Sequence, residues 1–227
     1  MPVLKRIVCL ANSRKLSGRC IAGKEQRPEG VGAWIRPVSD RSTQEVSAYE
    51  RQYQDGSDPR VLDIIDVPLH YAQPKAYQSE NWLLDPEQYW VHHGQATWAD
   101  LFALADDPPA LWLNGSSSGS GSNDRVGLAD AETLRNSLFL VHLADLRLRI
   151  FAPGAAFGNS KRRVQARFSH HGVSYGLWVT DPIVEREHLA MPDRESSVGE
   201  CFATISLGEP YEGYCYKLVA ALILPGA

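Results

Sequence analysis

Near the start of the chain, cationic, amide and aromatic residues gather in a combination that suits a phosphate backbone and its bases. They fall on expected turns and strand ends: Asn12, Ser13, Arg14, Lys15, Arg19, Trp34, Arg36 and Arg41. Cationic side chains track phosphates, and an aromatic ring can stack on a base. Alternation along 32–38 puts Trp34 and Arg36 on one strand face and Ile35 on the other. The alternative is that Trp34 lies in the core while the charges face solvent.

A second group of the same character lies in the later half of the chain. Its members are Arg147, Arg149, Arg163, Gln165, Arg167 and Trp178. A two-residue turn at His171–Gly172 predicts a hairpin over 162–180, with Phe168 opposite Tyr175 and Ala166 opposite Leu177. This register leaves the whole second group on the face away from the core, where we expect Trp178 to stack on a base. The alternative is that the group packs against the acidic stretch 42–132.

A third, looser group combines acids, tyrosines and one lysine: Asn123, Asp124, Arg125, Thr180, Asp181, Tyr214, Tyr216 and Lys217. Asp181 directly precedes Pro182, which favours a helix N-cap over a chemical role. Lys217 lies in an otherwise apolar strand, and we expect it to reach solvent or a ligand.

The sequence lacks the motifs of several common sites. There is no P-loop and no dinucleotide fingerprint. The pairs His92–His93 and His170–His171 are adjacent, and neighbouring residues of a strand point to opposite faces, so we expect no metal site from them. We therefore predict no cofactor, no metal and no catalytic residue.

Charge is segregated along the chain although the net charge is only −4. Residues 1–41 carry +6, 42–132 carry −11, 133–168 carry +6 and 169–227 carry −5. A protein with two basic blocks can present a local positive surface despite its acidic total.

Short apolar, β-branched runs bounded by glycine and proline predict a mainly β protein. Expected strands are 6–11, 18–23, 32–38, 61–71, parts of 82–93, 138–143, 146–151, the 162–180 hairpin, 200–207 and 214–224. Expected short helices are 98–105, 130–136 and 182–190, and 12–15 reads as a polar turn. The Ser/Gly-rich segment 114–123 is expected to be a mobile loop. The pattern lacks a βαβ rhythm and suits two OB-like five-stranded barrels with a few short helices, at 1–107 and 108–227.

The sequence also predicts the cellular compartment of the protein. No apolar run approaches the ~18 residues of a membrane span, and the first residues do not form a signal peptide. Four cysteines without CxxC spacing suit buried thiols in a reducing compartment. We expect a cytoplasmic protein that does not enter a membrane.

Five phrases in order resemble the prokaryotic dual OB-containing domain family. They are LANSRKLSGRCIAG (10–23), GAWIRPVS (32–39), NDRVGL (123–128), VTDPIVEREHL (179–189) and SLGEPYEGYCYKLVAALI (206–223). The resemblance implies two OB-like barrels, nucleic-acid binding and a setting in prokaryotic conflict or defence systems. It supplies no catalytic residues.

These observations favour a module that binds single-stranded or structured RNA or DNA, partnered by an effector protein encoded nearby. A first alternative is a sensor that binds a nucleotide or modified base between the barrels and signals to a partner. A second is a metal-dependent enzyme that cleaves phosphodiesters, supported only by scattered Asp, Arg and Lys residues.

Overall fold

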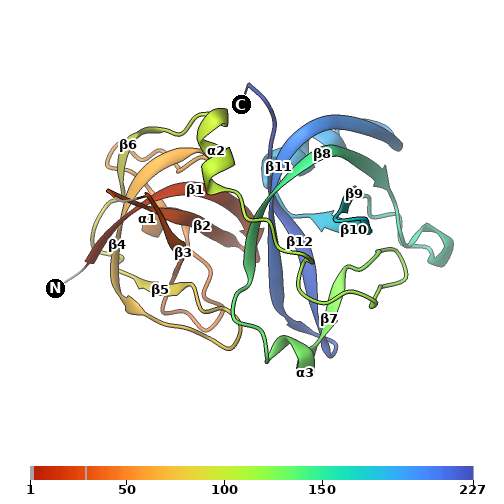
Figure 1. The fold of residues 1–227 in the computed structure, drawn as a ribbon, viewed down its shortest axis with the longest axis horizontal. Helices are drawn as coiled ribbons and strands as arrows, with labels where there is room; N and C mark the ends of the chain where they lie inside the picture. The colour runs from red at the N-terminus through yellow and green to blue at the C-terminus, as the bar shows by residue number, and fades with distance from the viewer. Residues whose placement is uncertain (1–2, 29, 227) are drawn as a thin grey trace. The chain divides into compact units, whose positions relative to one another are not determined.

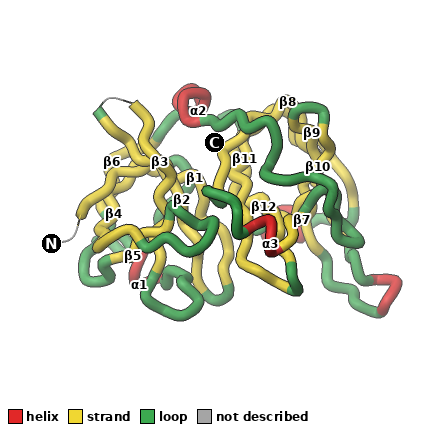
Figure 2. The backbone as a smooth tube through the Cα atoms, turned by 60° about the horizontal axis from the view of Figure 1, so that its bottom comes forward, coloured by secondary structure: helices red, strands yellow, loops and turns green. Residues whose placement is uncertain are grey.

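The computed structural model describes residues 3–28 and 30–226. The chain divides into two compact units, residues 1–104 with 135–137, and residues 105–134 with 138–227. Strands dominate both units and helices are short (Figures 1 and 2). No helix among the described residues is long and apolar enough to cross a bilayer.

The first unit contains six strands and two helices. In chain order they are β1 (Val3–Lys15), β2 (Gly18–Arg27), β3 (Gly30–Val38), α1 (Ala48–Arg51), β4 (Asp63–Ala72), β5 (Asn81–Leu84), β6 (Val91–Gln95) and α2 (Trp98–Leu104). Five strands close on themselves in the order β1-β2-β3-β5-β4, with β4 returning to β1. Among the strands of the described residues in this unit, β3 and β5 alone pair in parallel, and β6 adds to β4 outside the ring.

The second unit repeats this topology. Its elements are β7 (Arg125–Gly127), α3 (Leu128–Ala131), β8 (Leu138–Phe151), the 3₁₀ helix η1 (Ala155–Phe157), β9 (Arg163–His170), β10 (Val173–Val179), α4 (Pro182–Leu189), β11 (Arg194–Tyr211) and β12 (Tyr214–Ile223). The ring runs β8-β9-β10-β12-β11 and back to β8, again with one parallel pair, β10 and β12. β7 adds to β12 outside the ring.

Both rings have the strand order of the five-stranded Greek-key barrel of the OB-fold. The expected fold class is therefore confirmed, with one addition: each barrel carries a sixth, annexed strand. The short helix that follows the third ring strand, α1 or α4, occupies the same place in each unit.

Alternation along the strands sends apolar side chains into each barrel. In the first unit the core includes Ile7, Cys9, Ile21, Ile35 and Ile65. In the second unit, buried inward positions are Leu146, Leu148, Ile150, Val164, Ala166 and Leu177. All four cysteines are free thiols, and three of them are buried.

Strand curvature depends on local irregularities rather than on breaks. The two strands expected at 138–143 and 146–151 are one strand, β8. Its pairing with β11 is irregular around Gly199, with an extra residue on β11 between Ser197 and Gly199 and an extra residue on β8 between Leu143 and Leu146. Gly199 takes a positive φ of 74°, which glycine adopts without strain. At Gly23 a side chain would lie 2.2 Å from the Val8 carbonyl oxygen, so the close approach of β1 and β2 requires glycine.

The predicted hairpin and the helices expected at 98–105 and 182–190 are confirmed, whereas the helix expected at 130–136 is shifted to α3 at Leu128–Ala131. Phe168 faces Tyr175, Ala166 faces Leu177, and the turn lies at 171–172. The Asp181 carboxylate caps α4 by accepting hydrogen bonds from the Ile183 and Val184 amides. The expected polar turn at 12–15 is wrong: these residues complete β1, and the chain reverses at 16–17.

The segment 114–123, predicted from its composition to be a mobile loop, is a loop that specific hydrogen bonds tie to the rest of the unit. The buried Asp124 carboxylate accepts the Ser118 amide at 2.7 Å and the Ser118 hydroxyl at 2.5 Å. Ser122 pairs with Gly176 on the edge of β10, and the Ser120 carbonyl accepts the Gln165 amide nitrogen at 2.6 Å. A low-complexity composition thus coincides with an ordered loop folded around one carboxylate.

We predict that Gly121→Ala lowers the free energy of unfolding by about 1–3 kcal/mol, the usual cost of overpacking. A Cβ at Gly121 would lie 1.9 Å from an oxygen of the Asp124 carboxylate. Gly119→Ala is the matched control, because its Cβ would meet nothing within 4 Å, and it should change stability by under about 0.5 kcal/mol. Urea denaturation measures both variants. Equal stabilities would show that the segment is not packed in this way.

Candidate nucleic-acid interface

The second group of predicted residues does share the outer face of the second barrel. On β8 and β9 the cross-strand pairs are Arg147 with Arg167, Arg149 with Gln165, and Phe151 with Arg163. On β10, Trp178 lies opposite Gln165. The intervening residues of β8 and β9 point into the core, so alternation alone positions these side chains outward.

One end of this face is closed. The Arg149 guanidinium lies 4.1 Å above the Phe151 ring, Phe151 stacks on Trp178 with centroids 5.7 Å apart, and the Arg163 guanidinium lies 4.1 Å from the Trp178 ring centre. Trp178 is 7% exposed and Gln165 is 3% exposed. The expectation that Trp178 is open to stack on a base is therefore wrong. Truncating an aromatic buried in this way typically costs about 3–5 kcal/mol, so Trp178→Ala would report on stability.

The other end of the face is open and cationic. Arg147 and Arg167 are exposed and directly opposite each other, an arrangement of like charges that is unfavourable without an anion between them. The Glu195 carboxylate of β11 supplies that anion, with one oxygen 3.6 Å from Arg147 and the other 3.1 Å from Arg167. One carboxylate therefore bridges two guanidinium groups on the surface.

A groove of about 620 Å³ lies beside this bridge. It is lined by Ser122, Ala144, Asp145, Arg147, Arg167, Phe168, Ser169, Ser174, Tyr175 and Glu195. The lining combines two arginines, the carboxylates of Asp145 and Glu195, three serines and two aromatic rings. The acids that pair with its arginines, Glu195 and Asp145, lie outside 42–132, so the alternative of packing against that acidic stretch is wrong for Arg147 and Arg167.

The first group, in contrast, is mostly tied into its own barrel. Arg36 is buried and donates to Glu80 at 3.2 Å, Asn81 at 3.2 Å and Ser137 at 2.6 Å. Lys24, opposite Trp34, donates to the Leu104 carbonyl at 2.7 Å. Because Arg36 is buried, its guanidinium cannot reach a phosphate of a bound nucleic acid. The predicted role of Arg36 in nucleic-acid binding therefore does not fit its position.

The remaining members of the first group are divided between internal bonds and the tip of one hairpin. Asn12 donates to the Pro59 carbonyl at 2.8 Å, and the buried Ser13 hydroxyl donates to the Cys20 carbonyl at 3.4 Å. Arg41 is bonded to Glu50 at 2.5 Å. Arg14 and Arg19 form a cross-strand pair at the end of β1 and β2, and Lys15 lies at the last paired position.

In the third group, Lys217 is fully buried instead of reaching solvent or a ligand. Its Nζ donates to the Leu113 carbonyl at 2.6 Å and lies 3.4 Å from the Asn114 Oδ1. Burial lowers the pKa of Lys217 to about 8 because the charged form loses its hydration. Burial also disfavours the charged form of Asp181, the residue that caps α4. It raises the pKa of this carboxyl although the hydrogen bonds that the carboxylate accepts act to lower it.

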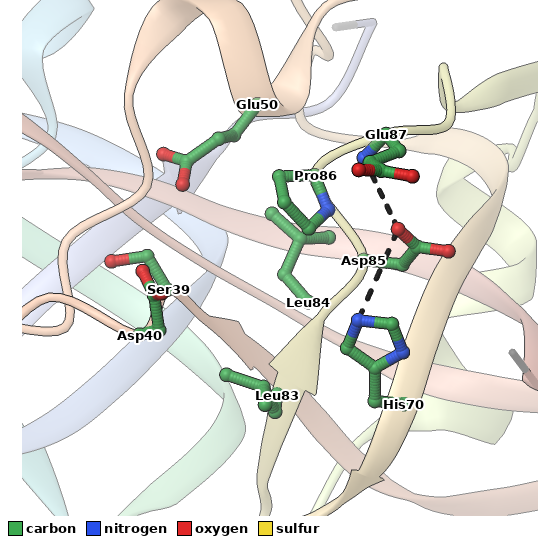
Figure 3. A pocket seen from close by; sticks show the side chains of 9 residues that line it. All are labelled: Ser39, Asp40, Glu50, His70, Leu83, Leu84, Asp85, Pro86 and Glu87. Carbon is green, nitrogen blue, oxygen red and sulfur yellow. Dashed lines mark hydrogen bonds and ion pairs between the residues drawn. The ribbon is translucent and has the colours of Figure 1, made fainter.

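A cavity of about 400 Å³ in the first unit is lined by acidic side chains, in contrast to the groove beside Arg147 and Arg167 in the second unit (Figure 3). Asp40, Glu50, Asp85 and Glu87 line it, and His70 lies 3.9 Å from Asp85. Burial works to raise the pKa of Glu50, but hydrogen bonds from Arg41 and Ser47 outweigh it and hold that pKa below its usual value. A cavity lined by carboxylates repels phosphates, so it does not fit a nucleic acid.

Sequence reasoning missed Glu195, the residue that joins the two open arginines. The segment between Ala190 and Glu200 was expected to be a connection, whereas β11 already begins at Arg194. The sequence carries no local sign of this, because the register with β8 is set by a partner more than 40 residues away.

The model of the dual OB-containing domain family matches residues 5–222. No curated protein and no solved structure gives a match.

The burial of Lys217 predicts a specific pH dependence. A lysine whose pKa falls from 10.5 to about 8 on folding costs stability below pH 8, and this cost disappears as the pH rises toward 10.5. The stability of the wild type relative to Lys217→Met should therefore increase by about 2–3 kcal/mol between pH 8 and pH 10.5. Urea denaturation of both proteins at several pH values gives this difference. A difference independent of pH would mean that Lys217 keeps an ordinary pKa.

Proposed function

The chain belongs to the dual OB-containing domain family, and we propose that it is a nucleic-acid-binding module that holds single-stranded or structured RNA or DNA. The proposed contact surface is the open end of the outer face of β8 and β9. OB barrels bind ligands on the face of their second and third strands and on the adjacent loops. In the second ring these strands are β9 and β10, which contribute Arg167, Ser169, Ser174 and Tyr175 to the groove, and β8 adds Arg147 beside them.

The observation that carries the proposal is the carboxylate between Arg147 and Arg167. Two guanidinium groups, each directed at a different oxygen of one anion, are a geometry that a phosphodiester can also satisfy. The Glu195 side chain is partly exposed, so it can move aside without uncovering a core. Arg149, two residues along β8, extends the positive charge along the same face.

A second candidate, a sensor of a nucleotide or modified base, is favoured by the size of the groove. Its volume of about 620 Å³ falls within the range of small-molecule sites, which is roughly 300–1,000 Å³. In this version the same arginine pair would hold the phosphate of a mononucleotide. Salt dependence separates the candidates, because only a chain of phosphates releases many counterions on binding.

The proposed biological setting rests on the family resemblance alone. It comprises a prokaryotic conflict or defence system, an effector protein encoded nearby, and the cytoplasm. The four free thiols agree with a reducing compartment.

Replacing both arginines in Arg147→Gln/Arg167→Gln should weaken binding of a fluorescent single-stranded oligonucleotide. It should also reduce the slope of log K against log salt by about 1–2, because each lost phosphate contact removes about one unit or less. Arg6→Gln/Arg27→Gln is the control, since these exposed arginines are paired with Asp66 and Glu25 in the other barrel. Fluorescence anisotropy at two salt concentrations measures both, with RNA, DNA and mononucleotide as ligands.

Glu195→Gln tests the same surface, but we expect it to change the affinity for the oligonucleotide in the opposite direction. Removing the competing carboxylate should raise affinity, and by more than Glu200→Gln, which makes the same charge change elsewhere on β11. An unchanged salt slope in the double arginine variant, or weaker binding by Glu195→Gln, would contradict the proposed surface.

A further inference from the structure

Three side chains with metal-binding groups meet in the second unit, away from the arginine pair. Asp107, His170 and His171 each offer a ligand atom, and these atoms lie within 4.8 Å of one another. Among residues 3–28 and 30–226, no other group of three His, Cys, Asp or Glu side chains brings its ligand atoms this close together. None of the three lines the groove beside Arg147 and Arg167.

The two histidines converge because of the hairpin turn. His170 is the last residue of β9, and His171 begins the turn with a positive φ of 46°. This conformation interrupts strand alternation, so the ring centroids lie only 4.4 Å apart. The expectation that adjacent histidines diverge is therefore wrong for this pair.

The other adjacent pair provides the comparison. His92 and His93 both lie within β6, where the register with β4 shifts by one residue and leaves His93 unmatched. His92 lies 3.5 Å from Asp63, whereas His93 lies 2.7 Å from Asp66, so each imidazole faces a different carboxylate.

The surroundings of His170 suit a ligand. Its ring is 7% exposed, and its Nε2 lies 2.7 Å from the Pro108 carbonyl oxygen. A nitrogen that faces a carbonyl oxygen donates its hydrogen, which leaves Nδ1 of the neutral ring as the nitrogen with a lone pair. Such a hydrogen bond from the second nitrogen to a carbonyl is the usual support of a metal-bound histidine.

The third ligand, Asp107, is exposed to solvent and lies next to His171. The Asp107 Oδ1 lies 2.6 Å from His171 Nε2, and both side chains are exposed, that of Asp107 by 80%. An ion would replace this hydrogen bond with one bond to each partner, which needs only a small movement of exposed groups.

We propose that Asp107, His170 and His171 bind one divalent first-row transition metal ion, with water completing its coordination. Two imidazoles and one carboxylate suit Zn²⁺ and related ions, whereas Mg²⁺ and Ca²⁺ prefer oxygen ligands. The ion would link the chain at Asp107 to the turn of the β9–β10 hairpin. This site is independent of the proposed nucleic-acid interface.

The test is calorimetric titration of chelator-treated, untagged full-length protein with ZnCl₂ at pH 7.5. We expect one saturable event per chain and a higher melting temperature with Zn²⁺. His171→Asn and Asp107→Asn should each weaken binding at least about tenfold, since each removes a ligand. Asparagine tolerates the left-handed conformation at position 171, so that variant preserves the turn.

His142→Asn is the matched control. His142 is also an exposed histidine in the second unit, 2.7 Å from the Glu200 carboxylate, and among the described residues it belongs to no such group of three. Its replacement should leave Zn²⁺ affinity unchanged. The proposal is overturned by absence of a saturable event, by Zn²⁺ binding that survives both ligand variants, or by an equal loss in His142→Asn.

Discussion

The parallel pairing of the third and fifth strands is the interaction on which the rest of each unit depends. It joins β3 to β5 in one barrel and β10 to β12 in the other, and so closes a ring that is otherwise antiparallel. In a closed ring every strand has one inward and one outward row of side chains. The apolar row fills the core, and each charged or amide side chain of the outward row then needs solvent, a partner or a ligand.

The two barrels meet that requirement differently. In the first, Lys24 and Arg36 on β2 and β3 are bonded to Leu104 and Ser137, so chain segments of the same unit cover part of the outer face. In the second, one half of the outer face is closed by the Phe151–Trp178 stack, and the other half leaves Arg147 opposite Arg167. An OB-fold does not by itself specify a free binding face; what lies over the early strands decides it.

Period-two alternation made the hairpin register and the shared face of the second group predictable, and the Asp181–Pro182 pair predicted the cap of α4. Features that depend on distant residues were not predictable. The burial of Trp178 requires Phe151 from another strand, the order of 114–123 requires Asp124, and Glu195 meets the arginines only through the pairing of β11 with β8. The convergence of His170 and His171 depends on one backbone angle, which alternation does not describe.

The most direct test of the central claim is amide hydrogen exchange of the full chain with and without a saturating single-stranded oligonucleotide. We expect slower exchange in β8 and β9 around Arg147 and Arg167 and at the start of β11 around Glu195, with no change across β2 and β3. Slower exchange confined to β2 and β3, with none around Arg147 and Arg167, would contradict the central claim.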